Sequence, residues 1–163
     1  MSAAPPDQKA PAIPIEVGVV DVLVFRAVER GWQVLVLRRG TATRCPGTWE
    51  MVHGKVEPGE SLPTAARREL KEETGLDAGQ LLSVTMHPFY LAQTGTVQLA
   101  AVFAAVVAGD AAVKRGAEHD KHGWVTVAAA RRRFTWPHER RHLDDAYTLL
   151  RTPAVHDVLR VSE

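Results

Sequence analysis

The chain has 163 residues, of which 45% are hydrophobic and 24% are charged, and its formal net charge is +1. This size and composition predict one globular domain, and the near-neutral charge gives no general attraction to nucleic acid or membranes. The single cysteine, Cys45, excludes a disulfide framework and a multi-cysteine zinc site. The chain shows neither a signal-peptide core nor an apolar run of about 18 residues, which predicts a cytoplasmic location without membrane contact.

The N-terminal part predicts a tail followed by a β-hairpin. Residues 1–14 are rich in Ala and Pro and predict a disordered tail, which leaves residues 15–163 as the single domain. Val17–Val28 is dense in β-branched residues and predicts a strand. After a turn at Gly31, Trp32–Arg39 predicts its antiparallel partner, and a loop rich in Thr, Pro and Gly follows.

Ser61–Thr74 has the clearest helix signals in the chain. Ser61 suits the N-cap position, and Pro63 lies in the first turn, where its missing N–H costs little. Gly75 follows the last turn and suits the left-handed residue that ends many helices. These signals predict a helix that begins just after Ser61 and ends at Thr74.

The rest of the chain predicts further strands and a second helix. These are the strands Leu81–Leu91, Thr96–Val107 and Trp124–Val127, and a helix that contains Asp144–Leu150 and ends before Pro153. The pattern predicts an α/β protein of the α+β type, in which a few helices pack on a mixed β-sheet.

Three glutamates share one face of the first predicted helix. At about 100° per residue, Glu69, Glu72 and Glu73 fall together beside the apolar stripe, not opposite it. Like charges at this spacing repel, and partial burial beside the stripe raises the cost. Arg68 can hold one carboxylate, which leaves most of the negative charge open. The face therefore predicts a divalent-metal site for a hard cation such as Mg²⁺ or Mn²⁺.

The same residues resemble a family signature. The Nudix box consists of G, five residues, E, seven residues, R-E, an aliphatic residue, any residue, E-E, any residue, G and an aliphatic residue. The chain matches it without departure at Gly54, Glu60, Arg68, Glu69, Leu70, Glu72, Glu73, Gly75 and Leu76. The resemblance implies the family's α/β/α sandwich with a mixed sheet, over about residues 17–150.

The resemblance also implies a set of metal ligands. Glu69, Glu72 and Glu73 match the family's ligands for divalent cations, together with the backbone carbonyl of Gly54, and Glu60 matches a further acidic residue near the metals. Members of the family hydrolyse nucleoside diphosphates linked to another group. We therefore expect Mg²⁺-dependent hydrolysis of a phosphoanhydride bond, with two or three ions present when substrate is bound.

The expected catalytic residues are Glu69, Glu72, Arg68 and Glu118. Glu69 is the first choice for the general base, and Arg68 matches the arginine that orients a box carboxylate. Glu118 belongs to Glu118-His119, four residues before Trp124, which resembles an E-H-x-x-x-x-W element of some branches. There the glutamate approaches the metals or the attacking water, so Glu118 is an alternative base.

The residues before the box bear on the substrate. Val52-His53 stands where the branch acting on oxidised guanine nucleotides usually has Pro-Gly. The pattern W-x-x-V-x-G-x-V-E-x-G-E resembles dATP or dihydroneopterin triphosphate pyrophosphohydrolases instead. A diadenosine tetraphosphate hydrolase is the alternative, and a non-hydrolytic module that binds nucleotide or RNA is a third. The expected partner is a small nucleotide-type substrate, and the expected state is a monomer or a homodimer.

Four residues are candidate substrate contacts. Arg38 and Arg39 end the second predicted strand, and alternation points one of them inward. Lys55 is a further candidate phosphate contact, and Tyr90 is a candidate to stack on a base. Its neighbour Phe89 could stack in the same way, and the alternative for both aromatic residues is packing in the core.

The Arg-rich segment 131–141 has two interpretations. It is either a solvated helix face with Trp136 anchored in the core, or a grip for polyphosphate or RNA. The seven histidines show no metal-ligand spacing and are interpreted as structural or surface groups. His53 is the exception, because it adjoins Gly54.

Overall fold

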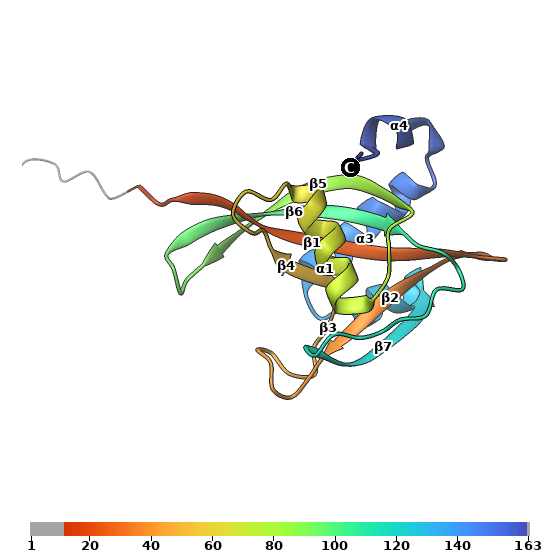
Figure 1. Cartoon of the computed structure of the whole chain (residues 1–163), viewed down its shortest axis with the longest axis horizontal. Helices are drawn as coiled ribbons and strands as arrows, with labels where there is room; N and C mark the ends of the chain where they lie inside the picture. The colour runs from red at the N-terminus through yellow and green to blue at the C-terminus, as the bar shows by residue number, and fades with distance from the viewer. Residues whose placement is uncertain (1–11, 163) are drawn as a thin grey trace, which may run out of the picture.

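The computed structural model describes residues 12–162, in which seven strands form one mixed sheet between helices (Figure 1). Helix α1 (Leu62–Thr74) covers one face of the sheet, and α3 (Pro137–Leu150) covers the other. This arrangement confirms the predicted α+β fold with three α/β/α layers. The predicted tail falls mostly on residues 1–11, outside the described part, and the boundaries of the single domain stay a prediction.

Strand β1 (Ile15–Val28) is the centre of the sheet. It forms an antiparallel hairpin with β2 (Gly31–Arg39), in which Phe25 lies opposite Val34. On its other edge β1 runs parallel to β6 (Thr96–Val106). These pairings confirm the hairpin that was predicted from the β-branched pattern.

The remaining strands extend the sheet on both sides. β5 (Gln80–Leu91) pairs antiparallel with β6, and β4 (Val52–Lys55) pairs with β1. β2 also pairs with the two-residue strand β3 (Trp49–Glu50) and with β7 (His119–Thr126). β7 begins earlier than the predicted strand at Trp124, and β3 and β4 were not predicted. Both are too short to show a pattern in the sequence.

The ends of α1 follow the predicted signals. The Ser61 side chain accepts a hydrogen bond from the Thr64 backbone N–H at 3.3 Å, so Ser61 is the N-cap. Gly75 ends the helix at φ 71°, and its N–H donates to the Lys71 carbonyl at 2.8 Å. A left-handed residue is required there, which explains the glycine. The helix therefore has fixed ends, and its acidic face has a fixed direction.

The C-terminal part is more helical than predicted. The helix α2 (Val127–Arg133) was missed, whereas α3 contains the predicted Asp144–Leu150 and begins at Pro137. Thr126 caps α2 by accepting from the Ala129 N–H at 3.2 Å. The turn η1 (Pro153–Val155) and the short α4 (His156–Leu159) follow. Within residues 12–162, none of the helices is both long enough and apolar enough to span a bilayer.

Alternation along β1 divides the core between the two faces. Val20, Val22 and Val24 pack with Ala66 and Leu70 of α1. A fully buried side chain of this size contributes about 1.5–3 kcal/mol. The apolar stripe of α1 therefore fixes the helix on the sheet, as predicted, with its glutamates beside the contact.

On the opposite face, Leu23 and Phe25 of β1 pack with Phe134 and Leu143. Phe134, which follows α2, is fully buried, whereas Trp136 is 37% exposed. The interpretation of Trp136 as the core anchor of the Arg-rich segment was therefore wrong. The sequence offered two aromatic residues there, and the backbone between the helices turns Phe134 inward.

Candidate active site

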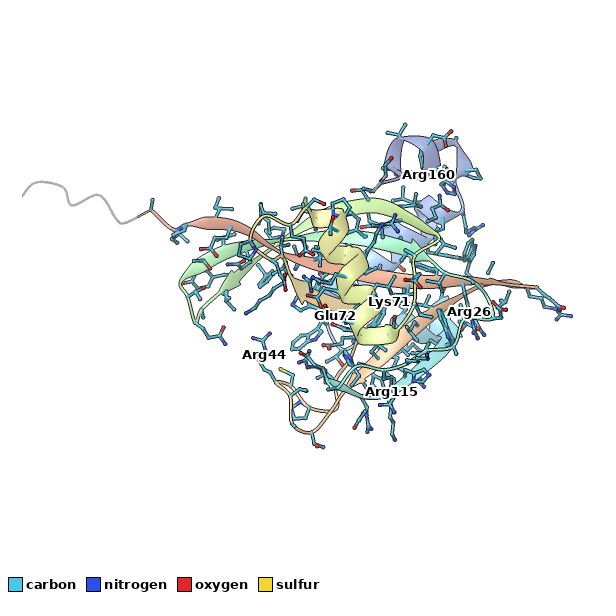
Figure 2. All side chains as sticks on the ribbon, viewed as in Figure 1. Arg26, Arg44, Lys71, Glu72, Arg115 and Arg160 are labelled. Carbon is cyan, nitrogen blue, oxygen red and sulfur yellow. The ribbon has the colours of Figure 1, made fainter. Side chains whose placement is uncertain are left out.

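The acidic face of α1 lines a cavity of about 570 Å³. Glu69 and Glu73 are mostly buried against β4, and the Glu72 side chain is 59% exposed. Arg44, on the loop after β2, lines the same cavity as Glu72, and Figure 2 labels both. The lining is completed by Arg39, His53, Gly54, Lys55, Gly116, Ala117 and Glu118.

Gly54 lies directly beneath the side chain of Glu69. A methyl group on Gly54 would overlap the Cγ and Cδ atoms of Glu69. The backbone of β4 therefore lies so close to the Glu69 side chain that only glycine fits at position 54. This contact brings the Gly54 carbonyl and the Glu69 carboxylate into one neighbourhood, where both were predicted to bind metal.

Arg68 connects the loop before α1 to the acidic face. Its Nε and Nη2 donate to the two oxygens of Glu60 at 3.0 and 2.9 Å. Its Nη1 donates to Glu69 Oε1 at 2.8 Å, with Glu72 Oε2 further away at 3.4 Å. Nη2 also donates to the Lys55 carbonyl at 2.7 Å. These bonds, to Glu60 first and then to Glu69, raise the pKa of the Arg68 guanidinium.

Glu60 faces Arg68 with both of its oxygens. Its Oε2 also accepts from the Glu57 N–H at 3.0 Å. The bond to Arg68 and the bond from the Glu57 backbone lower the pKa of the Glu60 carboxyl. Glu60 is therefore anionic and holds Arg68 in place, and its predicted position near the metals stays a prediction.

Glu73 is a buried carboxyl, and no Arg or Lys among the described residues forms an ion pair with it. Burial, and next the charges of Glu50 and Glu69, raise its pKa to about 9. Its Oε2 is buried and makes no hydrogen bond to the described residues. A divalent cation would supply both the missing partner and the missing charge, and carboxylate oxygens are the donors that Mg²⁺ prefers. The acidic face therefore fits the predicted metal by donor type and charge.

Glu50 and His119 are buried neighbours of Glu73 that were not predicted as site residues. Glu50 Oε1 accepts from Arg39 Nη1 at 2.9 Å and lies 3.1 Å from His119 Nε2. The other ring nitrogen of His119 lies 3.8 Å from Glu73 Oε2. His119 thus separates two carboxyls. Its place after Glu118 was noted in the sequence, but nothing local indicated that it is buried.

A second cavity, of about 940 Å³, adjoins the acidic one. The two share Arg39, Arg44, His53 and Lys55. Strand β5 and the start of α3 provide much of the remaining lining of the larger cavity. That lining includes Asp21, Glu50, His87, Phe89, Trp136, His138 and Glu139. A ligand can therefore extend from the acidic cavity, past a cluster of cationic side chains, into a larger space with aromatic walls.

Arg39 and Lys55 lie where a phosphate-binding residue is expected, at the junction of the two cavities. Arg38 does not, because its guanidinium binds the Asp120 carboxylate at 2.7 and 2.6 Å. Alternation thus pointed one arginine inward, as expected. Arg38 was also proposed as a substrate contact, but the structure places it outside both cavities.

The structure separates Phe89 from Tyr90. Phe89 lines the larger cavity, whereas Tyr90 is 60% exposed and lies outside its lining. Of these two candidates for base stacking, Phe89 therefore borders the cavity and Tyr90 does not, and the stacking itself stays a prediction. Neighbouring residues of a strand point to opposite faces, so only one of the two can face the cavity.

Glu118 and His53 border the junction. The Glu118 side chain is 60% exposed, and its Oε2 binds Arg39 Nη2 at 3.1 Å. His53 Nδ1 lies 2.6 Å from Oδ1 of Asp21, which is buried. Burial lowers the pKa of His53, but the bond and the charge of Asp21 outweigh it and raise the pKa. His53 lines the acidic cavity beside Gly54, and its closeness to a bound metal stays a prediction.

The Arg-rich segment contributes few arginines to the site. Arg131 forms an ion pair with Asp144, and Arg140 donates to the Phe134 carbonyl at 2.9 Å. The segment instead contributes Trp136 and Glu139 to the larger cavity. Glu139 Oε1 accepts from the Met51 N–H at 3.1 Å, and burial raises the pKa of this carboxyl well above its usual range.

Comparisons with known proteins agree with the fold and the box. The model of the NUDIX domain matches residues 17–147. The chain belongs to the Nudix family, and it is a hydrolase of phosphoanhydride bonds. The solved structure of a MutT protein from Methanosarcina mazei is 29% identical with a TM-score of 0.67, and the match covers 87% of this chain and 99% of that one.

Two curated relatives show how far the sequence similarity extends. A Mycobacterium tuberculosis protein provisionally named 8-oxo-dGTP diphosphatase 2 is 35% identical over 107 residues, which are 66% of this chain and 74% of that protein. An octanoyltransferase of Myxococcus xanthus is 40% identical over 104 residues, which are 63% of this chain but 29% of that protein. The match to the octanoyltransferase is therefore partial, and its named activity is not carried over to this chain.

Proposed function

We propose that this protein hydrolyses a nucleoside triphosphate, or a related pterin triphosphate, in a Mg²⁺-dependent reaction. The observation that carries the proposal is the meeting of the two cavities at Arg39, Arg44 and Lys55. Phosphates bound at these cations would lie beside the acidic face of α1. The base and sugar would occupy the larger cavity, with Phe89 and Trp136 as aromatic contacts.

Each acidic residue has a proposed role. Glu69, Glu72 and Glu73, with the Gly54 carbonyl, hold two or three Mg²⁺ or Mn²⁺ ions, which neutralise phosphate charge and lower the pKa of the attacking water. Arg68 fixes Glu69 by its bond to Oε1, which leaves Oε2 for other contacts.

Two carboxylates are candidates for the general base. Glu69 is the first choice, because its carboxylate is held over β4 and faces the acidic cavity. Glu118 is the alternative, because it lines the same cavity and its carboxylate is more exposed. Replacing each by glutamine in turn distinguishes them, since loss of the base lowers kcat much more than KM.

The names of similar proteins point to several different nucleobases or pterins as the recognised group of the substrate. Similar proteins carry names for 8-oxo-dGTP, CTP, diadenosine tetraphosphate and dihydroneopterin triphosphate. The solved structures named for the last two are 22% and 23% identical to this chain, an identity that supports the fold alone. Nucleoside triphosphates, including oxidised ones, are therefore the first substrates to test. The Val52-His53 sequence favours dATP and the pterin triphosphate over oxidised guanine nucleotides.

The test is a substrate panel with identification of every product. Release of a monophosphate and pyrophosphate from one triphosphate would support the proposal. ATP and AMP from diadenosine tetraphosphate would instead identify the alternative enzyme. Glu73→Gln should abolish turnover in excess Mg²⁺, while Glu57→Gln, an exposed glutamate of the same box outside the cavity lining, should retain it. Full activity of Glu73→Gln would contradict the mechanism.

A further inference from the structure

Three side chains form a row across the sheet in the larger cavity. Glu16 of β1 lies opposite Gln98 of β6, and Gln98 lies opposite Phe89 of β5. Residues that are opposite one another in paired strands project from the same face of the sheet. All three residues line the larger cavity. A ring that stacks on Phe89 therefore lies beside the polar groups of Gln98 and Glu16.

The amide of Gln98 is held in one orientation. Its Nε2 donates to Glu16 Oε2 at 2.7 Å and to Thr96 Oγ1 at 2.8 Å. A carboxylate oxygen can only accept, so the NH₂ group has to face Glu16, and both of its hydrogens are used. A flipped amide would place its oxygen against the carboxylate. Gln98 therefore presents its Oε1, which is purely an acceptor, away from these two partners.

The Oε1 atom of Gln98 is an acceptor without a donor. Gln98 is only 7% exposed, and among residues 12–162 its side chain makes only the two hydrogen bonds from Nε2. Gly18, which also lines the larger cavity, leaves the space beside Oε1 free, since a methyl group on Gly18 would lie 3.4 Å from this atom. A mostly buried acceptor without a partner is unfavourable, and an N–H group of a ligand would satisfy it.

We propose that Gln98 recognises the substrate by accepting a hydrogen bond at Oε1 from the amino group of a base such as guanine or a pterin. The inference rests on the proposed function, which places the base in the larger cavity. Glu16 supplies a second acceptor, because its Oε1 makes no hydrogen bond to the described residues. Two neighbouring acceptors fit two neighbouring donors, and guanine and pterins carry a ring N–H beside their amino group. Adenine has an acceptor beside its amino group and fits the row less well.

The experiment measures the binding of GMP, IMP and AMP to the whole chain by calorimetry in EDTA. IMP is GMP without the 2-amino group, so the pair isolates the proposed contact. We expect the wild type to bind GMP about tenfold more tightly than IMP, the effect of one hydrogen bond to a buried acceptor, and more tightly than AMP. Binding in EDTA does not depend on turnover. A preference for GMP without hydrolysis of any triphosphate would contradict the proposed function alone, and hydrolysis without this preference would contradict the role of Gln98 alone.

Two variants and a control test the residue itself. Gln98→Met keeps the length of the side chain but removes the acceptor, so GMP and IMP should bind equally well. Glu16→Gln changes an exposed residue and releases the amide of Gln98 from its fixed orientation, so the preference should decrease. Gln80→Met, on β5 outside both cavities, is the matched control and should keep the wild-type ratio.

Three results would overturn the proposal. The first is equal or undetectable binding of GMP and IMP by the wild type, and the second is tighter binding of AMP than of GMP. The third is an unchanged preference in Gln98→Met, with circular dichroism establishing that this variant is folded. If Gln98→Met does not fold, an unchanged preference in Glu16→Gln has the same meaning. A purely structural link between β1 and β6 would not alter the ratio of the two dissociation constants.

Discussion

Arg68 grips Glu60 through two parallel hydrogen bonds of 3.0 and 2.9 Å, while its remaining nitrogen holds Glu69 at 2.8 Å. Glu60 precedes α1, and Glu69 lies in its middle. One guanidinium thus ties the loop before the helix to the carboxylate over β4. A planar group with several fixed donors can do this, and a lysine cannot.

Arg68→Lys should therefore impair the site although the charge is conserved. Lysine has one side-chain nitrogen and cannot form the two parallel bonds to Glu60 while it also binds Glu69, so Glu69 loses its fixed direction. We expect kcat/KM to fall about tenfold to a hundredfold, the usual effect of removing a group that orients a metal ligand. Steady-state kinetics at saturating Mg²⁺ measure this. Arg131→Lys, on α2, is the matched control and should have wild-type kinetics. Equal kinetics in both variants would show that the simultaneous bonds of Arg68 to Glu60 and Glu69 are dispensable.

Glu73 should make stability depend on pH when divalent cations are removed. Its pKa is about 9 in the folded chain and near 4.5 when unfolded, so between these values the folded state holds one more proton. Stability from this group is complete below about pH 4.5, falls by up to about 1.4 kcal/mol per pH unit as the pH rises, and levels off above about pH 9.

Chemical denaturation in EDTA at a series of pH values measures this slope. Glu73→Gln cannot ionise, so its stability should fall less steeply than that of the wild type over the same window. Mg²⁺ should stabilise the wild type more as the pH rises, because it binds the ionised carboxylate. Parallel pH profiles for the wild type and Glu73→Gln would refute the raised pKa.

Gly54→Ala should displace the catalytic carboxylate. The added methyl group would overlap Cγ and Cδ of Glu69, so the side chain has to move away from β4. A displacement of about 1 Å at a reacting centre can cost about a hundredfold in rate. We expect kcat to fall by that order while the substrate still binds. Gly79→Ala is the control, because a methyl group there meets only ordinary contacts. Unchanged kcat in Gly54→Ala would mean that Glu69 is not needed in this position.

Phe89 and Tyr90 provide a paired test of the larger cavity. Phe89→Ala removes an aromatic wall, and stacking of a base on such a wall contributes about 1–3 kcal/mol. We expect KM to rise about tenfold to a hundredfold. Tyr90→Ala removes an exposed ring on the other face of β5 and should leave KM unchanged. If Tyr90→Ala raised KM more than Phe89→Ala, the substrate would bind on the opposite face.

The sequence predicted those parts of the site that local chemistry determines. Ser61 and Gly75 determine the two ends of α1 through hydrogen bonds within one helical turn. The spacing of Glu69, Glu72 and Glu73 places their side chains on one face of the helix. The resemblance to the Nudix box then indicated that this face binds divalent metal ions. No long-range information was needed for any of these steps.

Long-range pairing determines what the sequence did not predict. Glu50 and His119 are 69 residues apart in the chain, and they meet because β2 pairs with both β3 and β7. Phe89 rather than Tyr90 lines the larger cavity, and only the assembled sheet shows which face of β5 borders that cavity. His87 joins the two histidines of α3 only because that helix packs on the same face of the sheet. Such contacts follow from how the strands assemble, and no short pattern records them.

Different elements of the fold line the two cavities, and this affects how members of the family can diverge. The three box glutamates of the acidic cavity come from α1, whereas the walls of the larger cavity, proposed to hold the base, come from β1, β5 and the start of α3. Substitutions at Phe89 or Trp136 can therefore change which compound is accepted while the bond-cleaving groups stay intact. A duplicated gene could acquire a new substrate by a few changes in these walls, and inhibitors directed at them would discriminate between relatives that share the same box.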